Sequence, residues 1–230
     1  MVEEASTGYK KWLGDWTISG TGTVTHEDMS TSEETVTEHV TIVESIPNYE
    51  YTVYGWQQGL MGTYGEEDAI GFVARYNSDA ESMSFYSSSN LGTVDTGNYG
   101  MGIVEFLGYC DGDDLGGEYA GNEVSINGEY DIAIATMDGS GKVTVEPQVI
   151  PLTGGQSVRL LGMQYYATVS AGGLYWYTEH PRFGDDFTMV KGISGSSSSA
   201  AAQRSFMKIT KKTAAAESYH FPMTRSYMVK

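Results

Sequence analysis

Hydrophobic and polar residues alternate along most of the chain with a period of two. In residues 34–45, Val36, Val40 and Ile42 share one parity, while Thr35, Thr37, His39 and Thr41 take the other. The pattern recurs in residues 69–77 and, after a polar turn, in residues 82–87. Such alternation is typical of strands with one buried and one exposed face, and the last two segments predict a hairpin.

Further alternating segments follow, and glycine-containing turns separate them. The turn Met137–Lys142 carries an Asp-Gly pair, which suits a hairpin loop. The additional predicted strands occupy residues 14–25, 49–56, 100–109, 128–136, 141–150, 158–170, 173–178, 186–191 and 221–229. No amphipathic helix separates them, so the sequence predicts an all-β antiparallel barrel or sandwich.

The domain organisation follows from the length of the patterned region. We expect residues 9–230 to form a single β-barrel domain and residues 1–8 to be a linker or a cloning remnant. Residues 192–216 are rich in Ser and Ala, which predicts a loop and one short helix around Ala200–Arg204 near the C-terminus. This segment is either a lid or plug, or a flexible connection within the fold.

Charge and composition exclude several classes of protein. The net charge is −17, from 13 basic and 30 acidic residues, and such a field repels nucleic acid and anionic lipid surfaces. The single cysteine, Cys110, rules out an intramolecular disulfide, and we expect a half-buried thiol at a strand end. No segment predicts a signal peptide, and no apolar segment approaches the roughly 20 residues of a membrane span.

The segment that opens the first strand resembles a known family. Gly14-Asp15-Trp16 is similar to the opening motif of lipocalin-type barrels, in which the Trp closes one end of the barrel. The resemblance implies that Gly14 and Trp16 form a structural plug, that Trp12 packs over the same end, and that a basic side chain from a late strand supports Trp16. The sequence leaves open whether that side chain is Arg159, Arg182, Arg204 or Arg225.

A wider likeness extends over roughly residues 9–190. Residues 9–20, 49–56, 71–85 and 130–147 resemble lipocalin-like C-terminal domains of surface lipoproteins exported by Gram-negative gut bacteria. The resemblance implies an exported domain of a longer multidomain chain, at the cell surface or in the periplasm, anchored to the membrane through a segment outside this sequence. No second lipocalin motif is evident, so an open sandwich or a barrel with more strands stays an alternative.

The acidic loop at residues 110–123 is the candidate metal site. Its carboxylates are hard oxygen ligands of the kind that Ca²⁺ prefers, and they are Asp111, Asp113, Asp114 and Glu118. Leu115 and Asn122 stand where an EF-hand loop needs ligands, so that template fails. The competing interpretation, which we favour, is a solvated acidic loop without a cofactor.

Aromatic residues supply the candidate ligand contacts. Tyr and Trp combine an apolar face with a polar tip, which suits both barrel cavities and stacking on sugar rings. The residues selected as contacts are Tyr54, Trp56, Tyr165, Tyr166 and Trp176. The alternative interpretation is that these side chains only pack inside the barrel.

No ordered catalytic signature is present in the sequence. The four histidines lack zinc-site spacing, and no nucleophile elbow, P-loop or dinucleotide motif occurs. Glu50, Glu105 and Asp131 lie within strand patterns and are the candidates for a paired-carboxylate glycosidase. We therefore predict a non-enzymatic β-barrel module that binds a small hydrophobic molecule or a glycan. A structural or adhesive end domain is the first alternative, and a carbohydrate hydrolase is the second.

Overall fold

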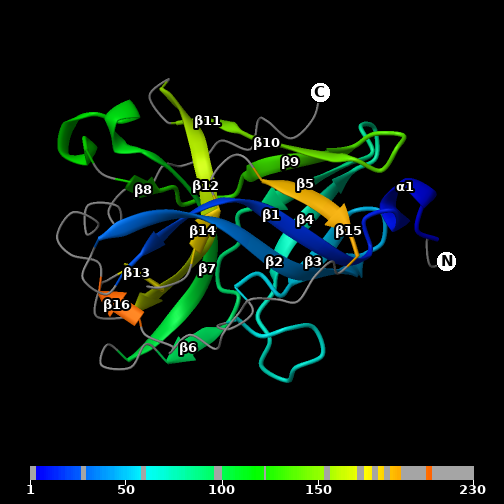
Figure 1. The fold of residues 1–230 in the computed structure, drawn as a ribbon, viewed down its shortest axis with the longest axis horizontal. Helices are drawn as coiled ribbons and strands as arrows, with labels where there is room; N and C mark the ends of the chain where they lie inside the picture. The colour runs from blue at the N-terminus through cyan, green and yellow to red at the C-terminus, as the bar shows by residue number, and fades with distance from the viewer. Residues whose placement is uncertain are drawn as a thin grey trace.

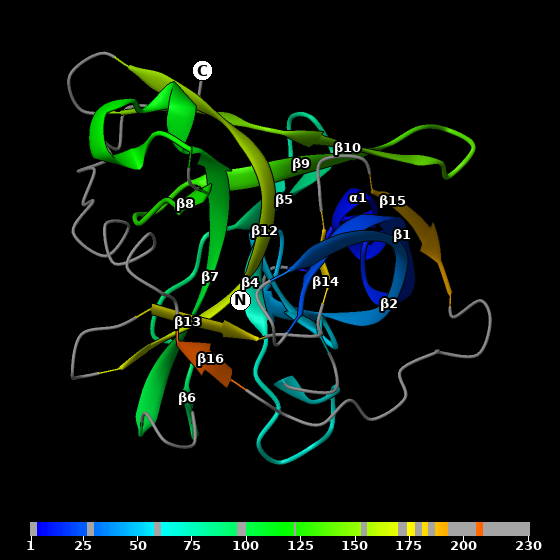
Figure 2. The same cartoon turned by 60° about the vertical axis from the view of Figure 1, so that its left-hand side comes forward.

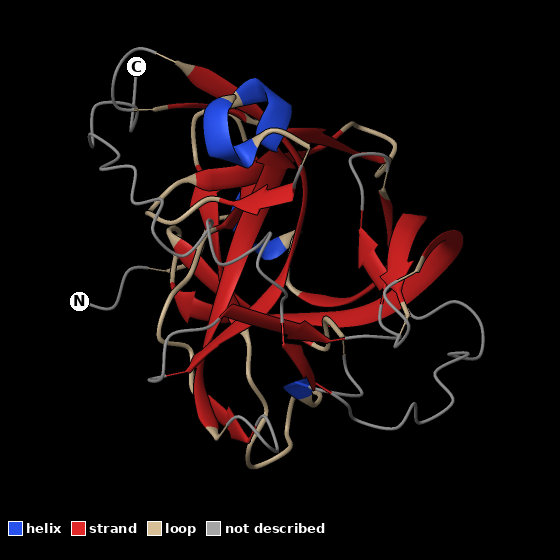
Figure 3. Cartoon of the chain, turned by 90° about the vertical axis from the view of Figure 1, so that its left-hand side faces the viewer, coloured by secondary structure: helices blue, strands red, loops and turns tan. Residues whose placement is uncertain are grey.

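The structure is a computed structural model in which strands make up most of the described chain (Figure 3). It describes residues 4–26, 30–57, 61–95, 100–121, 123–152, 156–169, 174–177, 181–183, 187–192 and 206–208.

Eight antiparallel strands form a closed barrel (Figure 1). They are β1 (Gly14–Thr25), β2 (Thr31–Ile46), β3 (Glu50–Tyr54), β4 (Phe72–Asn77), β5 (Ser82–Tyr86), β9 (Asp131–Met137), β10 (Val143–Pro147) and β15 (Thr188–Lys191). The ring closes because β15 pairs with β10 on one side and with β1 on the other, where Met189 lies opposite Ile18. The predicted antiparallel β-barrel is confirmed.

The two long connections of the barrel build a second sheet beside it (Figure 2). Residues 87–130 join β5 to β9, and residues 148–187 join β10 to β15. Their strands are β6 (Thr93–Asp95), β7 (Met101–Asp111), β8 (Glu123–Ser125), β11 (Val149–Pro151), β12 (Ser157–Val169), β13 (Leu174–Tyr177) and β14 (Pro181–Phe183). The principal pairing is β7 with β12, and β14 links β12 to the second half of β1.

Helical segments are short in the described chain. Helix α1 (Thr7–Lys10) precedes the barrel, and its N-cap Ser6 accepts a hydrogen bond from the Tyr9 amide, so part of the predicted linker belongs to this helix. The turns η2 (Gly112–Asp114) and η3 (Gly117–Tyr119) lie in the acidic loop. None of the described helices has the length and apolar character required to span a membrane.

The predicted C-terminal helix falls on residues outside the described ranges. Within residues 192–216 the structure describes a strand, β16 (Phe206–Lys208), where the sequence predicted a loop and helix. It pairs with β13 through Trp176 and Met207. Pairing with a strand distant in the sequence gives this segment its extended form, a contact that local composition does not reveal. The terminal strand predicted at 221–229 also lies outside the described ranges.

Large side chains fill the interior of the barrel. Alternate residues of each strand point inward and are nearly inaccessible to solvent. They include Trp16, Ile18, Val40, Ile42, Tyr51, Val53, Phe72, Ala74, Tyr76, Met83, Phe85, Ala133, Ala135, Val143 and Met189. Burial of this apolar surface is the main contribution to the stability of the fold.

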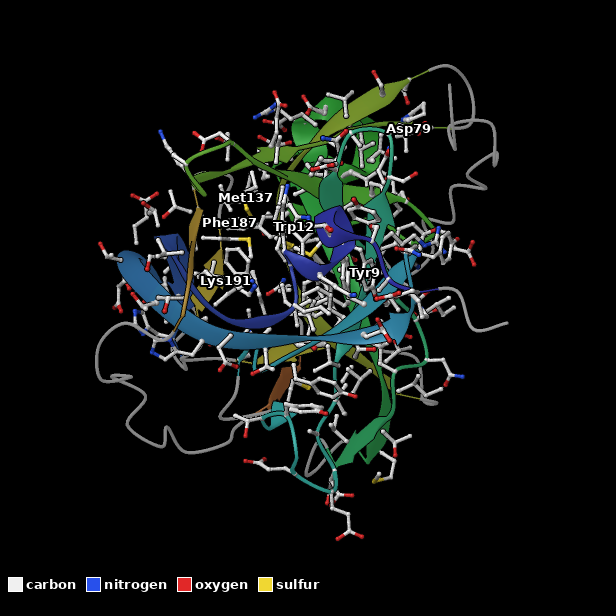
Figure 4. The ribbon with its side chains drawn as sticks, turned by 90° about the vertical axis from the view of Figure 1, so that its right-hand side faces the viewer. Tyr9, Trp12, Asp79, Met137, Phe187 and Lys191 are labelled. Atoms are coloured by element: carbon white, nitrogen blue, oxygen red, sulfur yellow. The ribbon has the colours of Figure 1, made fainter. Side chains whose placement is uncertain are left out.

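One end of the barrel is closed by the segment that contains α1 (Figure 4). The ring of Tyr9 stacks on Tyr51 with centroids 4.3 Å apart, and its hydroxyl donates to the carbonyl oxygen of Glu50 at 2.7 Å. The indole N–H of Trp16 donates to the carbonyl oxygen of Trp12 at 2.8 Å. Both indoles are completely buried, so this end is sealed by hydrogen-bonded aromatic side chains.

The opposite end is closed by Trp56, which follows β3. Its ring lies 5.9 Å from Phe72 of β4, 5.7 Å from Phe106 of β7 and 6.2 Å from Phe187 before β15. Phe106 in turn stacks on Phe72 with centroids 3.7 Å apart. The second sheet therefore contributes directly to the core of the barrel.

Candidate functional site

Trp56 lies inside the core and contributes to closing the barrel. The alternation in residues 49–56 placed Trp56 on the same face as Tyr54. The strand ends at Tyr54, however, and Gly55 takes a φ of +91°, which turns the following indole inward. With an exposed fraction of 0%, Trp56 offers no surface to a ligand without rearrangement of the core.

The remaining predicted ligand contacts do not converge. Tyr165 is buried beside Phe106, and its hydroxyl donates to the carbonyl oxygen of Ile70 at 3.3 Å. Tyr166 points to the other face of β12, where its hydroxyl accepts a hydrogen bond from Gln164. Tyr54 is half-buried, and its ring contacts Tyr64 on the β3–β4 loop.

Trp176 belongs to β13, but its side chain is outside the described part of the structure. The four contacts with described side chains are thus divided between the core, the second sheet and the outer wall.

The basic side chain next to Trp16 is a lysine. Lys191 Nζ of β15 lies 5.5 Å from the centroid of the Trp16 ring and donates to the carbonyl oxygen of Lys11 at 2.6 Å. Gly14, at the start of β1, has a φ of +105°, which favours glycine.

Of the four arginines considered for this position, the two that the structure describes lie elsewhere. Arg159 lies opposite Val149 in the second sheet, and Arg182 lies opposite Thr23 on the far half of β1. Arg204 and Arg225 fall outside the described residues. The sequence missed Lys191 because its proximity to Trp16 depends on the closure of the barrel between its first and last strands.

Carboxylates of the acidic loop hold the loop itself together. Asp111 accepts a hydrogen bond from the Asp113 amide at 2.9 Å, and Asp113 accepts one from the Gly121 amide at 2.6 Å. Asp114 is exposed, and the side chain of Glu118 is not described. Across the described chain, no group of three or more His, Cys, Asp or Glu side chains is arranged to hold a metal ion.

Cys110 is more deeply buried than the sequence suggested. Its exposed fraction is 0%, and it lies in the hydrophobic core on β7, a strand of the second sheet. Burial, with smaller contributions from Asp114 and Asp111, raises the pKa of the thiol to about 12. A thiol in this environment is a poor nucleophile.

An open cavity of about 420 Å³, lined by both polar and apolar residues, lies on the outer wall of the barrel, where β4 and β5 approach β7. This volume falls within the range of roughly 300–1,000 Å³ typical of small-molecule sites. We call it the outer-wall pocket. It is lined by Glu50, Val73, Arg75, Tyr86, Ser87, Ser88, Ser89, Leu91, Glu105, Leu107, Asn127, Gly128 and Glu129.

Arg75 and Tyr86 form the central contact of the outer-wall pocket. The Arg75 guanidinium carbon lies 3.4 Å from the centroid of the Tyr86 ring and 5.7 Å from that of Tyr49. Arg75 points outward because its neighbours Ala74 and Tyr76 face the core. Burial is the largest influence on Tyr86 and raises its pKa, while the guanidinium acts in the opposite direction. The stacking holds a planar group with several hydrogen-bond donors at the pocket wall.

The Ser87-Ser88-Ser89 run shapes the pocket where the chain leaves β5. The hydroxyl of Ser87 donates to the carbonyl oxygen of Gly128 and accepts from the Tyr130 amide. The hydroxyl of Ser88 accepts from the Val73 amide, and its backbone pairs with Phe106 of β7. These bonds join the barrel to the second sheet, so the pocket has a fixed backbone frame.

Two of the carboxylates noted in the sequence, Glu50 and Glu105, line the outer-wall pocket. Glu50 of β3 lies directly opposite Arg75 in the sheet and accepts a hydrogen bond from Ser45. Glu105 of β7 accepts one from Thr168 at 2.9 Å. Asp131 does not line the pocket, although its negative charge contributes to raising the pKa of Tyr86.

Arg75, Tyr86 and Glu129 were not selected from the sequence. The sequence offered two signals for this pocket. One was the single arginine, Arg75, within the alternating segment 69–77, and the other was the run of three serines after Tyr86.

Comparison of the chain with protein-family models, curated proteins and solved structures gave no match.

Proposed function

We propose that this protein is a non-enzymatic, lipocalin-like β-barrel module that binds a hydroxyl-rich small ligand, a sugar unit of a glycan, in the outer-wall pocket. The observation that carries the proposal is the composition of that pocket: a guanidinium, three carboxylates and a serine run, together with the apolar side chains of Val73, Leu91 and Leu107. Planar charged groups form paired hydrogen bonds with neighbouring hydroxyls, and apolar side chains contact the sugar's carbon face.

The lumen is a poor place for a ligand in this fold. The hydrophobic small molecule expected from the sequence would have to displace Trp56, Phe72 and Phe85, all fully buried. Displacement of these side chains would destabilise the fold, because a protein interior is close-packed. We therefore place the ligand outside the barrel.

The lipocalin-like type and the export of this domain are part of the proposal. The Gly14-Asp15-Trp16 opening, the cation beside Trp16 and the helix that precedes β1 support the type. The net charge of −17 and the single buried cysteine are compatible with a surface or periplasmic domain of a longer, membrane-anchored chain.

Titration of labelled protein with neutral monosaccharides, followed by NMR, tests the proposal. We expect shifts at the backbone amides of Arg75, Ser89 and Glu105, and weaker binding in the Glu105→Gln variant. Glu146→Gln, an exposed change on β10 that lies outside the pocket, is the matched control. Shifts confined to other surfaces would count against the proposed site.

A structural or adhesive end domain is the second candidate function. The observation that favours it is the closure of both barrel ends by Trp16 and Trp56. Such a domain would bind no sugar, and its melting temperature would not change with any ligand in a broad glycan screen.

A carbohydrate hydrolase is the third candidate, because Glu50 and Glu105 line the same pocket. Glycosidases use two carboxylates roughly 5–10 Å apart. Turnover of aryl glycosides that disappears in both Glu50→Gln and Glu105→Gln would establish this activity, and it would replace the binding proposal.

A further inference from the structure

The outer-wall pocket carries an excess of negative charge. Glu50, Glu105 and Glu129 line the pocket together with one guanidinium, that of Arg75. The pocket belongs to a chain whose net charge is −17, so the surrounding field has the same sign. A cleft lined by one sign of charge concentrates ligands of the opposite sign.

The carboxylates of the pocket have no lysine or arginine partner within the described structure. The ion pairs found there are Lys10–Glu4 and Lys11–Glu81, both around helix α1. Glu50 and Glu105 each accept a hydrogen bond from a neutral hydroxyl, from Ser45 and Thr168. A hydroxyl orients a carboxylate but leaves its charge in place, so the oxygens can still attract a cation.

Arg75 is tied to the wall of the pocket. Its guanidinium carbon lies 3.4 Å from the centroid of the Tyr86 ring, and in the sheet Arg75 sits between Glu50 of β3 and Ser84 of β5. The positive charge of Arg75 is therefore fixed at the side of the pocket formed by β4 and β5. Glu129, on the loop before β9, and Glu105, on β7, approach the pocket from other elements.

We propose that the outer-wall pocket selects ligands that carry a protonated amino group on a hydroxylated ring, such as an amino sugar with a free amine. The inference rests on the proposed function and specifies its ligand class. The amino group is placed by the carboxylates of Glu105 and Glu129. The ring hydroxyls hydrogen-bond to Arg75 and Ser89, and a ligand carboxylate is disfavoured by repulsion.

The experiment compares three sugars with the same ring and different charge: glucosamine, N-acetylglucosamine and glucuronic acid. Affinities are measured by NMR titration of the whole chain at about pH 6, where the amine of glucosamine is protonated. We expect glucosamine to bind roughly three- to tenfold more tightly than N-acetylglucosamine, and glucuronic acid to bind more weakly than either. The preference decreases as salt is added, because salt screens exposed charges.

Two variants separate charge selection from binding itself. Glu129 is exposed, so Glu129→Gln is compatible with folding, and it is combined with Glu105→Gln. We expect the double variant to lose the preference for glucosamine, so that glucosamine and N-acetylglucosamine bind it with affinities within about twofold of each other. Glu146→Gln, away from the pocket, should leave the order of the three affinities unchanged.

The outcomes distinguish the inference from the proposed function. Equal affinities for the three sugars, or a preference for glucuronic acid, would overturn the inference and leave sugar binding intact. A preference for glucosamine that survives in the double variant would also overturn it. Absence of binding by all three sugars would overturn the inference together with the proposed function.

Discussion

Lys191 and Trp16, from the last and first strands of the barrel, lie in contact across its closure. Lys191 Nζ is 5.5 Å from the centroid of the Trp16 ring and also donates to the Lys11 carbonyl oxygen at 2.6 Å. A cation above an indole ring is favourable because the face of the ring carries negative potential. The pair joins β15, β1 and the segment after α1.

Replacement of Lys191 by Met should therefore weaken the barrel closure. We expect Lys191→Met to lower the free energy of unfolding by about 0.5–1 kcal/mol, the range for exposed cation–π pairs. Urea unfolding monitored by tryptophan fluorescence measures this. Lys142→Met, in the exposed β9–β10 turn, is the control, and an equal loss in both variants would show that the Trp16 contact contributes nothing.

Truncation of Trp56 should open a void at the other end of the barrel. Trp56→Ala removes an indole surrounded by Phe72, Phe106 and Phe187, and such changes cost about 3–5 kcal/mol. Tyr64→Ala, at an exposed residue of the same loop, should cost less than about 0.5 kcal/mol. We also expect free indole to raise the Tm of Trp56→Ala and not that of the native chain. Similar stabilities of the two variants would contradict this placement of Trp56.

Gly20 tests the packing of β1 against the residue that precedes β15. A Cβ atom added at Gly20 would lie 2.8 Å from the Cα and Cβ atoms of Phe187. We expect Gly20→Ala to lower the free energy of unfolding by about 1–3 kcal/mol, because backbone rather than a flexible side chain must move. Gly139→Ala, where a Cβ meets no atom within 4 Å, is the matched control. Thermal unfolding of both variants measures the two changes in stability. A Gly20→Ala variant that is as stable as the native chain would contradict the tight contact.

Buried tyrosines should make the protein sensitive to alkali. Burial raises the pKa of Tyr130 and of Tyr165 above the ordinary tyrosine value. Folding therefore favours the protonated form, so their contribution to stability is complete below about pH 10 and is lost as the pH rises further. Urea unfolding between about pH 8 and 11 should show a falling free energy of unfolding above pH 10, by up to ~1.4 kcal/mol per pH unit for each tyrosine.

Tyr165→Phe supplies the control for the alkaline transition. This variant removes one titrating group, and its hydroxyl makes a single hydrogen bond, to Ile70. The slope above pH 10 should be smaller in the variant than in the native chain. Identical slopes would mean that Tyr165 does not stay protonated in the folded state.

Cys110 should not react with thiol reagents in the folded protein. Burial raises the pKa of its thiol to about 12, so almost no thiolate exists at neutral pH. We expect no reaction with a thiol-specific disulfide reagent at about pH 8 within the time of a normal assay, and one equivalent of reaction after addition of urea. Rapid labelling of the folded chain would show that β7 opens locally.

The antiparallel barrel was predictable from sequence because alternation is a local property. Val36, Val40 and Ile42 repeat every two or four residues, and a pleated strand places such residues on one face whatever its neighbour is. The hairpin of β4 and β5 and the turn at Asp138 followed equally directly, since turn residues and strand parity lie within a few positions.

The placement of Trp56 and Lys191 depended on the folded structure. A positive φ at Gly55 reversed the parity expected for Trp56, and one such residue suffices to turn a predicted outward side chain into the core. Lys191 meets Trp16 only because β15 closes the ring against β1. The division of the strands between the barrel and the second sheet was decided in the same way, by pairing of β7 with β12.

The sequence by itself determined that this chain forms strands, where most of them lie and which of their residues are apolar. Tertiary structure alone decided which strands close the barrel, which aromatic rings close its ends, and that Glu50, Arg75, Glu105 and Glu129 share one pocket. The reason is that strand propensity acts between neighbours in the chain. A pocket depends instead on the packing of segments far apart in sequence, and hydrophobic burial, which drives that packing, has no direction of its own.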